Sequence, residues 1–435
     1  MLNYLDMNKK IKIAFIKSGG LSAGGTEKFL QVMAANLPKD RFEVDYYYCD
    51  PAPFRNININ TISTDPGRIE FMHEHNINLI KFNVECVDLS TYTHDWINTD
   101  FWEKFNENKY DIIQTGRAGH PEYPFFKIKH TPIVDSLHLS GMVDNQYNIS
   151  RVMHICKWNA DKWIKKGGDK KKIVSSSLFL YIPNKDYKNL RKELNIEDKF
   201  VYGFYQRNND DIFSPIPLVA YKKEENDNTV FVLMNGSELY KKQAQELRIK
   251  NIIFLPFAKT QEKIYEFLLT LNVFAHGRRD GEVNSTVIAE AMRFGLPIVS
   301  HFSDINNGHV ECIGNAGKVV ASVDEYANEL LKLKNDKDYY KYRSEEAKKR
   351  FAENYEISRQ VNNIIKIYED VIKNPFPNKT RRLYFHFVNF FIKRFIINKY
   401  TYLTLRKLQK ITRNNTRNNI GKFKKLIDNF LKQNL

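Results

Sequence analysis

Residues 281–292 read GEVNSTVIAEAM, and residues 294–300 follow as FGLPIVS. Two glutamates, Glu282 and Glu290, lie in this stretch with seven residues between them. The pattern predicts a helix that begins near Ser285 and leads into a buried strand, because a Gly-Leu-Pro turn precedes a short apolar run. The first amides of a helix attract an anion such as a diphosphate, and a carboxylate one turn inside can accept hydrogen bonds from a ribose. Without further context, Glu290 is more simply explained as a solvated helix side chain.

Strands and helices alternate on both sides of this stretch. Strands are expected at residues 11–16, 42–48, 78–82, 111–114, 132–137, 152–156, 200–205, 229–234, 251–255, 271–275 and 297–300, and helices at 26–37, 158–166, 215–223, 260–270 and 286–294. Such alternation predicts an α/β fold with parallel sheets covered on both faces. We expect one domain at residues 1–185 and a second at 186–373, closed by an amphipathic helix at 358–372. A Pro-Phe-Pro sequence ends that helix, and a separate tail follows at 374–435.

The net charge is concentrated in this tail. The chain has 435 residues and a formal charge of +16, and residues 375–435 hold 15 Lys or Arg and one acid. The first 374 residues therefore carry 52 basic and 50 acidic side chains, a net charge of +2. Four widely spaced cysteines without zinc-type spacing favour a reducing, cytoplasmic setting. Neither a signal peptide nor an apolar run of membrane-spanning length is apparent.

A second motif lies between the first expected strand and the first helix. Residues 18–27 read SGGLSAGGTE. Glycines such as Gly24 and Gly25 let the backbone approach a ligand, and the amides of the helix start attract an anion. The stretch is not Gly-x-Gly-x-x-Gly and lacks the Gly-Lys-Ser/Thr of a P-loop, which argues against nicotinamide-cofactor and NTPase functions. A tight turn between strand and helix explains the glycines equally well.

Together the two motifs resemble those of retaining GT-B glycosyltransferases of the family 4 type, the glycosyl transferases of group 1. There the usual form is Glu-Gly-Phe-Gly-(x4)-Glu-Ala-Met followed by Gly-x-Pro-Val-Val, and a Gly-Gly-x-Glu loop lies near the start. Residues 132–138 are similar to the family's Pro-Val-Val-x-x-x-His strand end, and residues 355–372 to its closing helix. The resemblance spans about residues 11–373. It implies a GT-B fold, in which two Rossmann-like domains face a central cleft, here with a basic helical tail.

The resemblance also implies a reaction and a donor site. A hexosyltransferase of this type moves a sugar from a UDP- or GDP-linked donor to a hydroxyl acceptor with retention of anomeric configuration, and needs neither a metal nor a cofactor. In the implied roles, Glu290 holds the ribose and Glu282 approaches the donor sugar. The diphosphate is bound by Arg207 and by the backbone amides of Asn284, Ser285 and Thr286.

Other implied positions lie on the acceptor side, in the N-terminal domain. His138 ends an expected strand and would lie in the cleft near the transferred sugar, and Gly24 and Gly25 would line the cleft where the acceptor enters. A hydrogen-bonded core histidine is the alternative for His138. The acceptor itself, whether a glycan, a lipid or a protein, stays open.

The chain departs from the family pattern at one diphosphate contact. The family carries Gly-Arg-(x4)-Lys after the first strand of the second domain, whereas this chain has Arg207 with Ile212 in the position of the lysine. Arg278 or Arg279 is a candidate replacement for that cation, and we assign Arg279 to the donor site. A solvated arginine pair is the alternative. Val-Asn-Ser-Thr also replaces Gly-Phe-Gly-Leu between the two glutamates, which leaves the identity of the donor open.

Two short motifs suggest a metal but are better explained otherwise. Residues 73–75 read His-Glu-His without a third ligand at useful spacing, and residues 336–338 read Asp-Lys-Asp within a charged helical region. We therefore expect no metal site.

The tail mixes aromatic and basic residues. Between residues 379 and 432, Phe387, Phe391 and Phe395 recur at four-residue spacing among lysines and arginines. Such a helix suits the anionic surface of a membrane, which would place the protein at a membrane periphery and favour glycan or glycolipid synthesis there. Nucleic-acid binding is the less favoured partner. Packing of the aromatics on the N-terminal domain is a third possibility.

Two other functions remain open at this point. A GT-B nucleotide-sugar epimerase would bind the same donor without a sugar acceptor. A non-catalytic binding module, tethered by its basic tail, would have lost turnover. The missing lysine at Ile212 favours the module, and the presence of Arg207, Glu282 and Glu290 opposes it.

Overall fold

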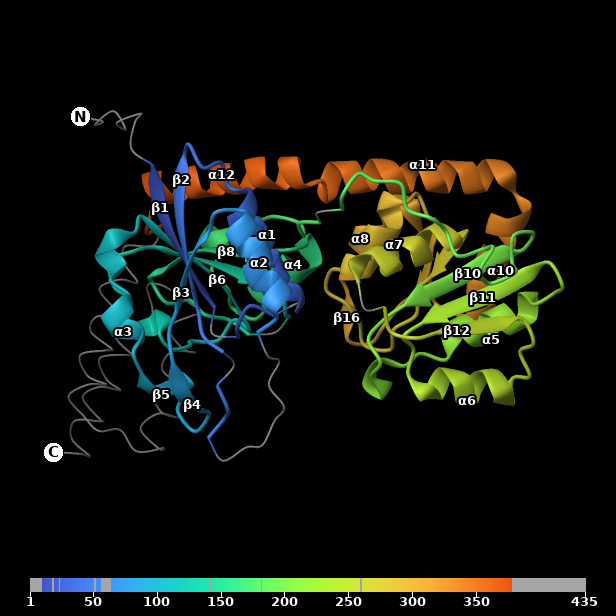
Figure 1. Ribbon diagram of the computed structural model, residues 1–435, viewed down its shortest axis with the longest axis horizontal. Coiled ribbons are helices and arrows are strands. Elements are labelled where there is room, and N and C mark those ends of the chain that lie inside the picture. The colour runs from blue at the N-terminus through green and yellow to red at the C-terminus, as the bar shows by residue number, and fades with distance from the viewer. Residues whose placement is uncertain are drawn as a thin grey trace, which may run out of the picture.

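The computed structural model describes residues 10–377 except 18, 23, 51, 56–63, 141, 181 and 259. The chain forms two α/β halves that lie side by side along the long axis (Figure 1). The tail segment 379–432, for which we expect a membrane surface as partner, lies outside the described residues, as do Ser18 and Ala23 of the glycine-rich stretch.

The N-terminal half is built on a seven-stranded parallel sheet. Its strand order is β3-β2-β1-β6-β7-β8-β9, with bounds β1 Ile11–Lys17, β2 Phe42–Tyr48, β3 Asn78–Lys81, β6 Ile112–Arg117, β7 Ile133–Leu137, β8 Ile149–His154 and β9 Ile173–Ser175. The main helices of this half are α1 Gly25–Asn36, α2 Pro66–Glu74, α3 Phe101–Lys104 and α4 Lys157–Lys165. An antiparallel hairpin of β4 Val84–Asp88 and β5 Asp95–Thr99, which the sequence did not predict, extends below the sheet (Figure 1).

The C-terminal half repeats the plan with six parallel strands. Their order is β12-β11-β10-β13-β15-β17, with bounds β10 Phe200–Tyr205, β11 Thr229–Met234, β12 Ile252–Leu255, β13 Val273–Ala275, β15 Ile298–His301 and β17 Gly317–Val320. The short strands β14 Gly281–Glu282 and β16 Asn306–Asn307 pair separately. The helices are α5 Ile216–Glu224, α6 Glu238–Glu246, α7 Gln261–Thr270, α8 Thr286–Arg293, α9 Gly308–Ile313 and α10 Val323–Asn335. The α/β class with parallel sheets is thus confirmed.

The last two described helices span both halves. Helix α11, Lys337–Asn354, covers the C-terminal half, and α12, Ile357–Lys373, runs back over β1 and β2 of the N-terminal half (Figure 1). The hydroxyl of Tyr368 on α12 donates to Gln114 Oε1 at 2.9 Å, and Arg151 Nη2 lies 2.6 Å from Asp370 Oδ2. The sequence predicts that this helix closes the C-terminal domain, whereas these contacts lie on the N-terminal sheet. The apolar stripe predicted a docked helix correctly, but a stripe does not identify the surface that it meets.

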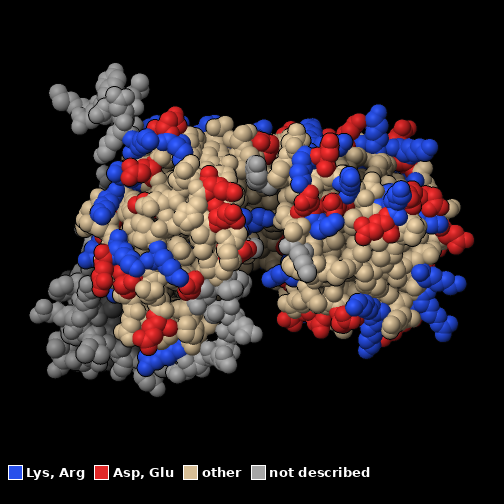
Figure 2. Space-filling view, viewed as in Figure 1, with Lys and Arg blue, Asp and Glu red and all other residues tan. Residues whose placement is uncertain are grey.

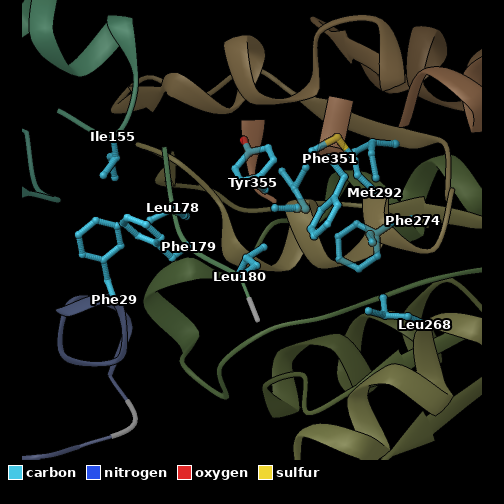
Figure 3. Close-up of a cluster of buried hydrophobic side chains, with 14 of the residues drawn as sticks. Phe29, Ile155, Leu178, Phe179, Leu180, Leu268, Phe274, Met292, Phe351 and Tyr355 are labelled. Carbon is cyan, nitrogen blue, oxygen red and sulfur yellow. The ribbon is translucent and has the colours of Figure 1, made fainter. Parts of the chain in front are cut away.

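A hydrophobic core continues between the halves along residues 178–180, which belong to the segment that connects them (Figure 3). Phe179 of this segment packs on Phe29 of α1, with ring centroids 4.9 Å apart. The next residue, Leu180, forms a β-bridge with Glu356 at the start of α12. Because this core includes side chains from both sheets, packing holds the two halves against each other.

The two sheets meet at the carboxyl ends of their strands. Ile155, just after β8, accepts a hydrogen bond from Asn284 at 2.6 Å, and Lys28 on α1 donates to Gln261 on α7 at 3.2 Å. Figure 2 shows a groove between the halves with basic and acidic side chains on its walls. In each sheet the strand order reverses once, between β1 and β6 and between β10 and β13. Ligands of open α/β sheets bind outside the carboxyl ends at such reversals, so the groove is where a site is expected.

Candidate functional site

Arginines gather at the reversal in the C-terminal sheet. Arg207 follows β10, and its side chain is exposed without an ion-pair partner among the described residues. Arg278 follows β13 and forms two hydrogen bonds with Asp280, at 2.6 and 2.8 Å. Its Nη1 also donates to Glu282 Oε1 at 3.0 Å. Arg278 and Arg279 were the two candidates to replace the missing lysine, and in the structure Arg278 is the one that contacts Glu282.

Glu282 lies between these arginines and the start of α8. Its carboxylate accepts from Arg278, lies 3.5 Å from Ser285 Oγ and is within electrostatic range of Arg207. Burial raises the pKa of Glu282 to about 7, and the charge of Arg278 opposes that rise. The carboxyl group therefore changes charge near neutral pH.

The start of α8 leaves two amides open. Ser285 is the N-cap, and its Oγ accepts from the amide of Ile288 at 3.4 Å. The Ser285 amide donates to Asn284 Oδ1 at 2.8 Å, so it is not available to a ligand in this state. The amides of Thr286 and Val287 have no acceptor in the part of the chain that the structure describes. Of the three amides expected to bind a diphosphate, those of Asn284 and Thr286 have no acceptor among the described residues, and that of Ser285 is occupied.

Asn284 joins the two halves. Its Nδ2 donates to the carbonyl of Ile155, and its Oδ1 accepts from Cys312 Sγ at 3.0 Å and from the Tyr355 hydroxyl at 3.3 Å. These contacts, together with the bond to the Ser285 amide, fix the loop before α8. The Val-Asn-Ser-Thr departure from the family pattern thus has a structural consequence, because the asparagine side chain is used for the domain contact.

Glu290 is buried in the first half of α8, with 3% of its surface exposed. It accepts hydrogen bonds from the Tyr205 hydroxyl and from Gln261 Nε2, the latter at 2.9 Å. Burial raises its pKa to about 7, and the charge of Lys28 from the opposite half opposes the rise. Burial in turn lowers the pKa of Lys28. Glu290 therefore faces the boundary between the halves rather than the outer surface of the C-terminal sheet.

The position of the missing lysine is part of the interior. Ile212 is 4% exposed, and its carbonyl accepts from the Arg279 amide at 3.1 Å. The Arg279 side chain is exposed. The sequence analysis assigned Arg279 to the donor site, but no described contact joins its side chain to Glu282.

The expected acceptor-side residues lie on the facing edge. A Cβ at Gly24 would come within 2.5 Å of Glu27 Oε2, so glycine is needed for that carboxylate to fold back, whereas a Cβ at Gly25 would meet nothing within 4 Å. The His138 ring packs edge-on against Phe29, with centroids 4.6 Å apart. Burial, aided by the charge of Lys17, lowers the pKa of His138 to about 3, so the imidazole is neutral. Its Nε2 has no hydrogen-bond partner within the described chain.

Three further residues, which no sequence motif indicated, lie around Glu290. Tyr205, Gln261 and Lys28 surround Glu290. Tyr205 is the last residue of a strand at the reversal, a position that could have identified it from the sequence. Gln261 and Lys28 come from separate helices of separate halves, and no sequence pattern connects them.

The described residues contain no group of three or more His, Cys, Asp or Glu side chains that could hold a metal ion. Asp336 of the Asp-Lys-Asp motif instead caps α11 by accepting from the Tyr339 amide at 2.9 Å. No helix in this part of the chain is long and apolar enough to cross a bilayer.

Comparison with known proteins gives a family match for part of the chain. Residues 186–350 match the family model described as "Glycosyl transferases group 1". This range contains β10 to β17 and all the residues described at the C-terminal reversal, whereas Lys28 lies outside it. A comparison with curated protein sequences finds no match.

Solved structures give the fold of the whole described chain. HepE from Anabaena, in complex with UDP-glucose, has a TM-score of 0.58 and 17% identity, over 83% of this chain and 100% of that one. A glycosyltransferase from Rickettsia africae has a TM-score of 0.63 and 12% identity, over 84% and 99%. Sucrose-phosphate synthase from Thermosynechococcus elongatus has a TM-score of 0.59 and 13% identity, over 84% and 100%. At these identities the likeness establishes the fold, which is GT-B, as the sequence predicted.

Proposed function

We propose that this chain, in which residues 186–350 carry the glycosyl transferases group 1 domain within a GT-B fold, transfers a sugar from a nucleotide-sugar donor to a hydroxyl acceptor. The observation that carries the proposal is the meeting of Arg207, Arg278 and the open amides of α8 at one strand edge. Such a set of donors suits a diphosphate. Glu290, within the same helix, is the group that binds the ribose.

These residues assist departure of the nucleoside diphosphate. An oxygen of the acceptor hydroxyl bonds to the anomeric carbon while the bond from that carbon to the donor phosphate oxygen breaks, and the electron pair leaves with the diphosphate. Negative charge therefore grows on the phosphate. Preorganised amides and a cation favour this transition state more than the ground state. Arg207 suits the role because its guanidinium is exposed and unpaired among the described residues.

Retention of the anomeric configuration is the finer part of the proposal. The acceptor attacks from the face that the diphosphate leaves, and its hydroxyl proton passes to an oxygen of the departing phosphate. Glu282 is held by Arg278, which favours a role in holding the donor sugar over one as a nucleophile. NMR of the product tests this: an α-linked donor must give an α-linked product, and a β-linked product would contradict retention.

Other parts of the proposal concern the setting of the reaction. Residues 1–185 contribute the acceptor side, and residues 186–373 contribute the donor side. The transferred sugar is a hexose. The reaction needs no metal ion or cofactor. The donor base is uracil or guanine.

We place the enzyme in the cytoplasm at a membrane surface, where it acts in glycan or glycolipid synthesis and where the tail contacts the membrane. Deletion of residues 375–435 must then abolish binding to anionic liposomes, and unchanged binding would refute the membrane contact.

An assay of nucleoside diphosphate release distinguishes transfer from the alternatives. The protein is incubated with UDP-glucose, UDP-galactose or GDP-mannose, with and without a mixture of sugar and glycolipid acceptors. A transferase releases UDP or GDP when an acceptor is present, an epimerase converts the donor without release, and a binding module does neither. We expect acceptor-dependent release. Donor epimerisation without release, or binding without turnover of any donor, would contradict the proposal.

A further inference from the structure

A second polar cluster lies at the reversal in the N-terminal sheet, opposite the donor residues. Lys17, the last residue of β1, has its Nζ 3.2 Å from Glu27 Oε1 on α1 and donates to the Gly116 carbonyl on β6 at 2.9 Å. Glu27 lies in the first turn of that helix, two residues after Gly25, where an added Cβ would meet nothing within 4 Å. The cluster thus begins where β1 and β6 diverge, which is the ligand-binding position of an open sheet.

Buried ion pairs hold the loop after β6. Arg117 is almost fully buried and pairs with Asp135 at 2.9 Å and Asp144 at 3.0 Å. Its Nη1 also donates to the carbonyl of His120 at 3.0 Å. These contacts fix the backbone of the loop that carries His120 and Glu122, so the two side chains are presented in a defined position.

His120 positions Glu122 at the edge of the cluster. His120 Nδ1 lies 3.5 Å from Glu122 Oε1 and is itself buried, and the other ring nitrogen is hydrogen-bonded to His94 at 3.0 Å. Lys17 acts electrostatically on Glu122. The side chains of Lys17, Glu27 and Glu122 are 15% to 19% exposed, so a small molecule can reach part of their surface.

The charges of the cluster disfavour an anionic ligand. Both of its cations have carboxylate partners, since Lys17 pairs with Glu27 and Arg117 with two aspartates. Glu122 adds a further carboxyl group, whose pKa burial raises. A phosphate placed here would meet carboxylates and find no unpaired cation among the described side chains. Hydroxyl groups, by contrast, can donate to the carboxylates of Glu27 and Glu122.

We propose that Glu27 and Glu122 bind the hydroxyl groups of an uncharged carbohydrate acceptor, with His120 holding Glu122 in place, and so select against phosphorylated acceptors. The inference rests on the proposed transferase function and adds the class of acceptor. In the transfer step, the acceptor oxygen bonds to the anomeric carbon as the diphosphate leaves, and the hydroxyl proton passes to the leaving diphosphate. Glu27 and Glu122 act as specificity-determining residues, His120 acts as a positioning residue, and none of them takes part in that bond exchange.

Acceptor kinetics test the inference. Glucose, galactose, N-acetylglucosamine, maltose and lactose are compared with glucose 6-phosphate as acceptors, with the donor that the protein binds. We expect transfer to an uncharged sugar with kcat/KM at least tenfold above that for the sugar phosphate. Glu122→Gln should raise the acceptor KM about tenfold, as loss of a hydrogen bond to a charged group does, with the donor KM unchanged. Glu246→Gln, an exposed change on α6, is the matched control.

Each outcome decides between the claims. A preference for glucose 6-phosphate, no transfer to any uncharged sugar, or an unchanged acceptor KM in Glu122→Gln would overturn the acceptor inference. If that variant fails to fold, Glu27→Gln gives the same test. Calorimetric binding of UDP or GDP separates the two proposals. If the nucleotide binds and the donor is slowly hydrolysed while no uncharged sugar is used, only the acceptor inference fails, and if no nucleotide binds, both fail.

Discussion

The two halves of this molecule share a strand order but carry different charges where that order reverses. At the C-terminal reversal, Arg207 is exposed and unpaired among the described residues, beside the open amides of α8. At the N-terminal reversal, Lys17 and Arg117 are neutralised by carboxylates. The same architecture therefore presents one edge suited to an anion and one suited to neutral hydroxyl groups.

The difference in charge bears on where the two proposed substrates would lie in one groove. In the proposed reaction, a diphosphate would be attracted to the C-terminal edge and repelled by the carboxylates of the facing edge. Asn284 and Lys28 form hydrogen bonds between the two halves. The four predictions below test this comparison.

The largest effect is expected from Arg207→Ala. Loss of the unpaired cation removes stabilisation of the charge that develops on the leaving group, and turnover should fall by about 10²- to 10³-fold. The rate of nucleoside diphosphate release under saturating donor measures it. Lys242→Ala, an exposed change on α6, is the control and should leave turnover unchanged. Equal activity of Arg207→Ala and wild type would show that the unpaired cation of the C-terminal edge does not stabilise the leaving diphosphate.

Glu290→Ala should weaken donor binding. The variant removes a buried carboxylate that would accept hydrogen bonds from ribose, and the loss of hydrogen bonds to a charged group corresponds to about a 10- to 100-fold higher donor KM. Measurement of KM for donor and acceptor separately localises the effect to the C-terminal edge. A rise in the acceptor KM instead would show that Glu290 belongs to the facing site.

Asn284→Ala should act on stability. Its side chain binds Ile155, Cys312 and Tyr355, so truncation leaves buried polar groups unsatisfied and should cost about 1 to 3 kcal/mol of unfolding free energy. Thermal denaturation with and without UDP or GDP measures this. Ser300→Ala, within β15, provides a buried polar control away from the domain contact. A large loss of nucleotide affinity at unchanged Tm would show instead that Asn284 binds the donor.

Glu282 should make stability depend on pH. Its pKa is about 7 in the folded protein and near 4.5 when unfolded, so the folded state holds the proton more tightly. The contribution of Glu282 to the free energy of unfolding is therefore fully present below pH 4.5 and is lost as the pH rises through 7. The loss is about 1 kcal/mol per pH unit, which corresponds to roughly 2 °C in Tm. In Glu282→Gln this part of the decline should disappear. Parallel pH profiles for the two proteins would contradict it.

The sequence predicted most of the framework because strand cores are apolar. The expected bounds of β2, β10 and β11 agree with the structure, whereas β8 begins at Ile149, three residues before its expected start. Asn148 and Arg151 interrupt the apolar pattern there, since their buried side chains bond to Phe125 and Asp370. Buried polar residues that bond to distant parts of the chain are invisible to a hydrophobicity pattern.

The candidate site was predictable where its residues are close in sequence. Glu282, Ser285 and Glu290 lie in one loop and helix, and their grouping followed from one motif. The facing cluster was missed because Lys17, Glu27 and Glu122 come from separate segments, and each residue resembles an ordinary surface charge. Only the strand order brings these segments together.

The central claim, that the C-terminal edge binds a diphosphate, is tested most directly by calorimetric titration of UDP and of GDP into wild type and Arg207→Ala. We predict that one of the two nucleotides binds wild type and that its Kd in the variant is at least about tenfold higher, a loss of about 1.4 kcal/mol. Equal affinity for both proteins, or no binding of either nucleotide to wild type, would contradict the claim.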